Sequence, residues 1–244
     1  FYSIWLFVIG SILGSYAVAT VWRIRAREVN SKKKNDGLTQ EDQRLKRTKL
    51  SHVKITTDYS RCLHCGHRLA WYDLVPVLSW LELRGKCRYC KQAIGVTEIL
   101  AEIGLGVVFV LSYLCLHSSV HRTILGLWML LLVVMTIMFV YDIKWQLLPL
   151  KTLYLGVGVA ALIAIIQISI QVVFKHQNLA HLLLQRLLAV NVLGGLYYLL
   201  AKISQQTWVG SGDAYVGTMA GLVLGDVWLA FLTLFLANAL GCLV

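Results

Sequence analysis

The sequence predicts an all-α polytopic membrane protein that carries one small cysteine-bearing insertion. Three observations predict this class: the composition, a series of long apolar runs, and a single strongly basic segment near the start. Hydrophobic residues make up 58% of the chain and charged residues 14%, and the mean hydropathy is +0.68. One soluble core cannot bury that much apolar surface, whereas a membrane helix needs only ~20 mostly apolar residues.

Seven runs are apolar enough to be transmembrane helices. They cover residues 1–22, 99–117, 123–141, 152–174, 183–201, 214–225 and 227–244. The chain begins at Phe1 rather than Met and ends inside an apolar run, so we expect both ends to be trimmed and the full chain to hold an eighth helix. Small-residue stripes predict close helix packing at Gly10, Gly14, Gly217, Gly221 and Gly225.

Charge divides the chain into a first transmembrane helix (1–22), a basic segment (23–97) and a polytopic membrane domain (98–244). The basic segment holds 17 of the 23 Lys and Arg side chains. By the positive-inside bias this segment is cytoplasmic and the N-terminus lies outside. Basic clusters also occur in proteins that bind nucleic acid or anionic lipid, but beside a first membrane helix the orientation rule explains them. We therefore expect the lipid bilayer, and no nucleic acid, as a partner.

Two Cys-x2-Cys pairs lie in the last part of the basic segment, residues 60–97. The pairs "CLHC" and "CRYC" are 21 residues apart, close to zinc-ribbon spacing, and supply Cys62, Cys65, Cys87 and Cys90. Four thiolates make a closed, tetrahedral, structural zinc site. Two disulfides are the alternative, but a cytosolic location argues against them. His64 and His67 are near enough to act as ligands, although four cysteines leave them no position.

The stretch between the two cysteine pairs is rich in aromatic and aliphatic side chains. Trp71, Tyr72 and Trp80 could form a small core supported by zinc, or an apolar patch at the membrane interface. The remaining thiols, Cys115 and Cys242, lie in apolar runs and are interpreted as packing residues.

Two aspartates stand at the ends of apolar runs. Asp142 follows the run 123–141, and Asp213 ends the motif "GSGD" 71 positions later. Two predicted helices, 152–174 and 183–201, separate them, so both carboxylates reach the cytoplasmic boundary of the membrane. Carboxylates are costly beside lipid unless they are paired, hydrated or functional. The structural alternative is that Asp142 caps a helix and Asp213 occupies a glycine turn.

Two carboxyl groups on one face have a chemistry of their own. They cannot both ionise cheaply when close together, so they share a proton, and one serves as base while the other serves as acid. Such a pair can activate water against a peptide carbonyl without a covalent intermediate. Gly210 and Gly212 would let the backbone turn sharply and bring a substrate close to Asp213.

Five segments carry distinctive motifs in a fixed order. They are "GSYAVATVWR" (14–23), "SRCLHCGHRLAWYDLVPVLSWLELRGKCRYC" (60–90), "TEILAE" (97–102), "YDIKWQLLP" (141–149) and "GSGD" (210–213). Together they resemble the type IV prepilin peptidases, the GxGD-type leader peptidase/N-methyltransferases of pilus, type II secretion and competence systems. The resemblance covers nearly the whole chain.

The resemblance implies an aspartic endopeptidase that uses Asp142 and Asp213. Such an enzyme removes the short basic leader of prepilin-like proteins at the cytoplasmic face of the bacterial inner membrane. It also implies a second activity, methylation of the new N-terminus with S-adenosylmethionine. For that activity the matching residues are Gly14, Ser15 and Arg23 on the first helix and Glu98 at the start of the second. Glu98 could attract a positively charged substrate group, or it could cap its helix.

Three positions depart from the family pattern. Val18 stands where members commonly have Asn, Tyr215 where they have Lys, and Leu150 where they have Asp. The two aspartates are unaffected, so the peptidase hypothesis is unchanged. The apolar Val18 cannot make the hydrogen bonds of an amide, which weakens the expectation of methyl transfer.

Two other classes of protein compete with the peptidase. A transporter or channel would use the two aspartates to bind ions or protons, and it leaves the cysteine module unexplained. A non-enzymatic assembly scaffold would hold pilin precursors through that module. Its binding would survive the loss of both carboxylates.

Overall fold

The structure is a computed structural model that describes residues 2–31, 60–62, 64–115 and 119–241. The chain forms two compact units. Unit 1 is Phe1–Cys115 with Phe139–Gln146, and unit 2 is Leu116–Met138 with Leu147–Val244. The basic stretch around Lys32 to Lys34 and the thiol of Cys242 lie outside the described residues.

The predicted fold class is confirmed. The described residues form helices and no strands, with two isolated β-bridges in the cysteine module. Five helical stretches are long and apolar enough to cross a membrane: Tyr2–Val29, Val96–Cys115, Thr123–Trp145, Leu150–Lys175 and Leu179–Ile203. The last two predicted spans form α9 (Ser211–Leu224) and α10 (Val227–Gly241). The 14 residues of α9 are fewer than the ~20 that a full span needs, and α10 is described up to Gly241.

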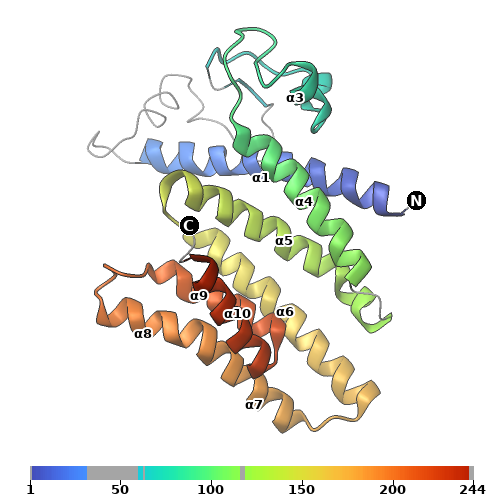
Figure 1. Cartoon of the computed structure of the whole chain (residues 1–244), viewed down its shortest axis with the longest axis vertical. Coiled ribbons are helices and arrows are strands. Elements are labelled where there is room, and N and C mark those ends of the chain that lie inside the picture. The colour runs from blue at the N-terminus through green and yellow to red at the C-terminus, as the bar shows by residue number, and fades with distance from the viewer. Residues whose placement is uncertain (1, 32–59, 63, 116–118, 242–244) are drawn as a thin grey trace. The chain divides into compact units, whose positions relative to one another are not determined.

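Helices α1 (Tyr2–Ser31) and α4 (Val96–Cys115) of unit 1 pack along each other through their glycines (Figure 1). A Cβ on Gly14 would lie 2.6 Å from the carbonyl oxygen of Ala101, and a Cβ on Gly10 would lie 2.8 Å from the Cα of Gly106. Only glycine allows two backbones to approach so closely. The packing predicted for this stripe is confirmed.

Several helices of the structure extend beyond the predicted runs, and two of them show the reason. Helix α1 continues past residue 22 to Ser31, because the basic side chains that follow are themselves good helix formers. Helix α7 (Leu179–Val190) begins four residues before the predicted start at residue 183. Asn178 causes the early start, since its side-chain oxygen accepts a hydrogen bond from the N–H of Ala180 at 2.9 Å.

The cysteine module joins α1 to α4. It contains a 3₁₀ turn, η2 (Trp71–Leu74), and the short helix α3 (Leu78–Glu82). Trp80 is half-buried, whereas Trp71 is 80% exposed. The aromatic residues therefore do not all belong to one small core.

Unit 2 is a bundle of helices with a main apolar core and a smaller apolar cluster at Ala189, Leu193 and Ala230. It contains the first part of α5 (Ser119–Trp145), then α6 (Leu150–Lys175), α7, the π-turn η3 (Asn191–Gly195), α8 (Leu196–Ile203), α9 and α10. Among the described residues, the side chains most deeply buried in its core are Leu153, Ala160, Ile163 and Met219. Helix α9 thus packs its middle into the core and leaves its first turn at the edge.

The small-residue stripe on α9 is also confirmed as a packing surface. A Cβ on Gly217 would lie 2.5 Å from the carbonyl oxygen of Leu193, and one on Gly221 would lie 2.7 Å from the Cα of Val190. Gly225 has a different role, because its φ of 64° ends the helix in the left-handed conformation.

Candidate active site

Asp142 lies in the last turn of α5 and is exposed. The helix ends three residues later at Trp145, and the next residue, Gln146, adopts a φ of 51°. The backbone N–H of Gln146 donates to the carbonyl oxygen of Asp142 at 2.7 Å. This C-terminal hydrogen bond leaves the carboxylate of Asp142 outside the cap, so the side chain does not serve as the cap itself.

The residues beside Asp142 are anchored to α1 within unit 1. Tyr141 is 1% exposed, and its hydroxyl donates to the carboxylate of Glu28. Trp145 packs edge-on against Trp22, with ring centroids 5.4 Å apart. Two buried or stacked aromatic rings on either side of Asp142 therefore hold this turn of the helix in place.

Lys144 ties the same turn to α4. Its ammonium group lies 3.9 Å from the carboxylate of Glu98 and 4.5 Å from the centre of the Trp22 ring. Glu98 stands in the first turn of α4, where the helix dipole also favours a carboxylate. The last turn of α5 is thus joined to both long helices of unit 1.

Asp213 lies in the first turn of α9 and is exposed. Gly210 caps this helix, and its carbonyl oxygen accepts the backbone N–H of Asp213 at 3.2 Å. A carboxylate at this place is stabilised by the positive end of the helix dipole.

The two glycines of the GSGD motif are not used for a sharp turn, contrary to the sequence interpretation. Gly210 has φ −71° and ψ 148°, which any residue can adopt. Gly212 is helical, and a Cβ there would overlap the side chain of Leu148. Glycine is therefore needed at position 212 for close packing, because Leu148 lies against the turn that carries Asp213.

The two aspartates belong to different units, Asp142 to unit 1 and Asp213 to unit 2. Each is placed at the end of a helix and is exposed. Their pairing stays a prediction.

The four predicted metal ligands come together in the cysteine module. The sulfur atoms of Cys62, Cys65, Cys87 and Cys90 all lie within 4.8 Å of one another. Those of Cys62 and Cys90 are 3.8 Å apart, the separation of roughly 3.8 Å expected for two thiolates bound tetrahedrally at Zn–S distances of ~2.3 Å. The four thiols are free rather than joined in disulfides. This set could hold one zinc ion and has no position left for a substrate.

The two cysteine pairs form matching turns. An isolated bridge joins Arg61 to Arg68 around the first pair, and another joins Lys86 to Ala93 around the second. In both turns a residue with positive φ, Gly66 or Lys91, donates its N–H to the carbonyl oxygen of the first cysteine at 2.9 Å. This repeated geometry presents two thiols from each turn to a common point.

The electrostatics at Cys87, in the second turn, favour a thiolate. Burial raises the pKa of the Cys87 thiol, but backbone N–H groups of Cys90 and Tyr89 and side-chain hydrogen bonds with Cys62 and Cys90 lower that pKa to about 7. Since the thiolate is the form that binds metal, Cys87 is prepared to be a ligand at neutral pH. His67 stacks on the ring of Tyr89 instead, with centroids 3.7 Å apart.

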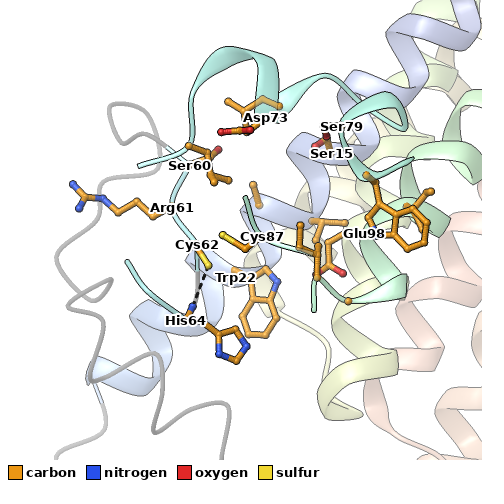
Figure 2. A pocket seen from close by; sticks show the side chains of 18 of the residues that line it. Ser15, Trp22, Ser60, Arg61, Cys62, His64, Asp73, Ser79, Cys87 and Glu98 are labelled. Carbon is orange, nitrogen blue, oxygen red and sulfur yellow. Dashed lines mark hydrogen bonds between the residues drawn. The ribbon is translucent and has the colours of Figure 1, made fainter. Parts of the chain in front are cut away.

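A cavity of about 420 Å³ lies between α1, the start of α4 and the cysteine module (Figure 2). Three of the residues matched to methyl transfer line it: Ser15, Arg23 and Glu98. Gly14 does not, because it packs against the backbone of α4. Of the four residues matched to methyl transfer, three therefore line one cavity and the fourth, Gly14, packs helices α1 and α4 together.

Three functional candidates were missed at the sequence level. Lys144 and Glu102 line the same cavity, and Glu28 holds Tyr141. Glu102 lies in the motif "TEILAE", four residues after Glu98, so the helical period could have placed both carboxylates on one face. The partner of Tyr141 is 113 residues away and carries no local signal.

Comparison with known proteins finds relatives of this chain. Residues 8–116 match the model of the bacterial peptidase A24 N-terminal domain. Two curated proteins named prepilin leader peptidase/N-methyltransferase are similar. The one from Vibrio cholerae is 35% identical over 39% of this chain and 36% of its own, and the one from Dichelobacter nodosus is 31% identical over 63% of this chain and 50% of its own.

The resemblance to the prepilin peptidase family is confirmed. The matched residues 8–116 coincide with most of the continuous part of unit 1, from α1 through the cysteine module to the end of α4. The chain spans half or less of the length of these prepilin peptidases. No solved structure matches the chain.

The three departures from the prepilin peptidase pattern lie in different surroundings. Val18 is 3% exposed and lines the cavity. Tyr215 packs edge-on against Tyr154, with ring centroids 5.9 Å apart. Leu150 begins α6 and is exposed. Only Val18 therefore touches the cavity that the methyl-transfer residues line.

Proposed function

We propose that this protein is an aspartic endopeptidase that removes the leader of prepilin-like precursors at the cytoplasmic face of the membrane. Its relatives carry the name of that peptidase. The observation that carries the proposal is the contact between Leu148 and Gly212. This contact holds Leu148, which follows Asp142 in the chain, against the turn that carries Asp213. Six positions of chain, which span at most roughly 20 Å, separate Asp142 from Leu148, and the proposal requires that Asp142 reach the turn of Asp213.

The proposed reaction is hydrolysis by a carboxyl pair that shares one proton. The ionised carboxylate takes a proton from water, whose oxygen attacks the peptide carbonyl carbon, while the protonated carboxyl gives its proton to the carbonyl oxygen. The tetrahedral diol then collapses as the C–N bond breaks. The leaving nitrogen takes one proton from the pair and a diol hydroxyl returns one, so the pair ends as it began.

The membrane orientation follows the distribution of charge. The protein is a multi-pass membrane protein, and the basic residues between α1 and α4 support a cytoplasmic position for the cysteine module. In this arrangement the four cysteines of the two turns would hold zinc as a structural ion, and the peptide chemistry would take place at the aspartates.

Co-expression with a candidate prepilin tests the peptidase. We expect the precursor to lose its leader in cells that carry this chain and to stay intact in cells without it, as read by a mobility shift and by mass spectrometry. A scaffold would bind the precursor without shortening it. A transporter would move ions or protons in vesicles and leave the precursor intact. Intact precursor beside folded protein, for every prepilin-like protein of the source genome, would refute the proposal.

Methyl transfer is a second candidate, supported by the cavity of unit 1. Ser15, Arg23 and Glu98 line it, and the carboxylate of Glu98 could attract the sulfonium of S-adenosylmethionine or the new amine of the pilin. Lys144 already neutralises part of that charge from 3.9 Å. Val18 supplies no hydrogen bond to the same cavity. We therefore propose a methyltransferase weaker than one with an amide at this position.

Glu98→Gln separates the two activities. Methylation of the mature pilin should be lost, because the glutamine carries no charge. Cleavage should change by less than about fivefold, since a partly exposed ion pair contributes at most about 1 kcal/mol. Mass spectrometry of the pilin N-terminus measures both. Glu82→Gln is the matched control, because Glu82 is an exposed carboxylate of the same unit that pairs with Arg88 at 3.4 Å. Lost cleavage in folded Glu98→Gln protein would show that the Lys144–Glu98 pair supports Asp142.

A further inference from the structure

Helix α3 of the cysteine module has an apolar face that nothing in the described part of the chain covers. Leu78 is 65% exposed and Leu81 is 58% exposed. Glu82 shares this face, but its carboxylate lies 3.4 Å from the guanidinium of Arg88, which offsets its charge. Two large aliphatic side chains one turn apart on a five-residue helix are costly in water.

The opposite face of α3 is turned toward a cavity that it shares with the membrane helices of unit 1. Ser79, Trp80 and Leu83 line the cavity described above, and its other walls include Ser15 and Val18 of α1. Figure 2 labels Ser79 and Ser15 among the side chains that line this cavity. Both α1 residues lie inside the candidate span Tyr2–Val29 rather than beyond its end. The inner face of α3 therefore shares a cavity with a part of α1 that is apolar enough to lie within the bilayer.

A buried carboxylate fixes the depth of α3 on α4. Glu102 is 9% exposed, and it accepts the backbone N–H of Val77, the residue that precedes α3, at 2.8 Å. Glu102 is the seventh residue of α4, so it lies about 9 Å along the axis from the start of that helix. Non-helical backbone at membrane depth must have its polar groups satisfied within the protein. The Glu102 carboxylate does this for Val77.

We propose that residues 74–83 dip into the membrane interface and that Leu78 and Leu81 contact lipid acyl chains. Trp71, 80% exposed in the preceding turn, suits the headgroup level, where tryptophan is enriched. Arg84 and Lys86 follow α3 and are exposed, so they can meet anionic headgroups. Three features favour the bilayer as the occupant of this face. They are the apolar face itself, the basic residues beside it, and the membrane helices that precede and follow the module in the sequence.

Photocrosslinking of the full chain in vesicles tests this surface. The photoreactive residue p-benzoylphenylalanine replaces Leu78 or Leu81 in separate variants, and Gln92, an exposed residue of the second cysteine turn, in the control. The vesicles contain phosphatidylcholine and phosphatidylglycerol. After illumination, mass spectrometry counts lipid adducts. We expect at least about fivefold more adduct at positions 78 and 81 than at position 92, because only the first two lie among acyl chains.

Zinc content, measured on each variant, shows that the module is folded before the adducts are compared. Equal lipid adduct at all three positions would overturn the proposal. So would adducts at 78 and 81 that join two copies of the chain, or the chain and a co-expressed prepilin, in place of lipid. The processing assay is run on the same variants, so a failure of the lipid contact is distinguishable from a failure of the peptidase.

Discussion

Asp142→Asn and Asp213→Asn should each abolish leader removal while the protein still inserts and folds. An amide cannot exchange the proton that the pair passes between water, the carbonyl oxygen and the leaving nitrogen. General acid–base groups contribute roughly 10²–10⁴-fold to a rate, so each variant should fall by at least about 100-fold. The measurement is the rate of precursor shortening by purified protein in detergent or vesicles.

Asp226→Asn is the matched control for these variants. Asp226 belongs to unit 2 and stands at the start of α10, where its side-chain oxygen accepts the N–H of Trp228 at 2.8 Å and of Leu229 at 3.0 Å. Asparagine caps a helix about as well as aspartate, so this variant should cleave normally. Normal cleavage by Asp142→Asn or by Asp213→Asn would remove that residue from the mechanism.

Cys87→Ser should remove zinc from the protein and loosen the cysteine module. Cys87 is 3% exposed at the centre of the four thiols, and in small domains the free energy of binding zinc is largely free energy of folding. We expect about one zinc per chain in the unmodified protein and a large loss in the variant. Metal analysis of the purified protein measures this. Trypsin should then cut at Arg61, Arg68, Arg84 and Lys86, while the membrane helices stay intact.

Cys115→Ser controls for the loss of a thiol as such. Cys115 ends α4 and is exposed, away from the four ligands, so zinc content and resistance to trypsin should be unchanged. Zinc-free protein with two disulfides among the four cysteines would contradict the prediction. It would also contradict the cytoplasmic orientation of the module, because stable disulfides form in oxidising compartments.

Much of the fold could be predicted because it depends on local composition. Long apolar runs must be helical in a bilayer, where every backbone N–H and C=O has to be satisfied within its own segment. The glycine stripes likewise predict close helix packing. The ends of helices were predicted less well: α7 starts at Leu179 because of Asn178, and α1 continues through basic residues to Ser31.

The cysteine module shows what the spacing of a motif can predict and what it cannot. Spacing alone predicts that four thiols converge, and they do. It cannot decide between the two interpretations of the aromatic residues between the pairs. The choice between them depends on the hydrogen bond from Val77 to Glu102, 25 residues away, and on which face of α3 lines the cavity.

The sequence by itself determined the class of the protein, the identity of the four thiols and the two aspartates at the ends of helices, because each is written in consecutive residues or in a fixed spacing. Only the tertiary structure decided what surrounds them. Tyr141 meets Glu28, Lys144 meets Glu98, and Leu148 packs on Gly212. These contacts join residues far apart in the chain, and they exist only because helix packing brings the backbones within a few ångströms of each other. No periodicity or spacing in the sequence encodes which side chains then meet.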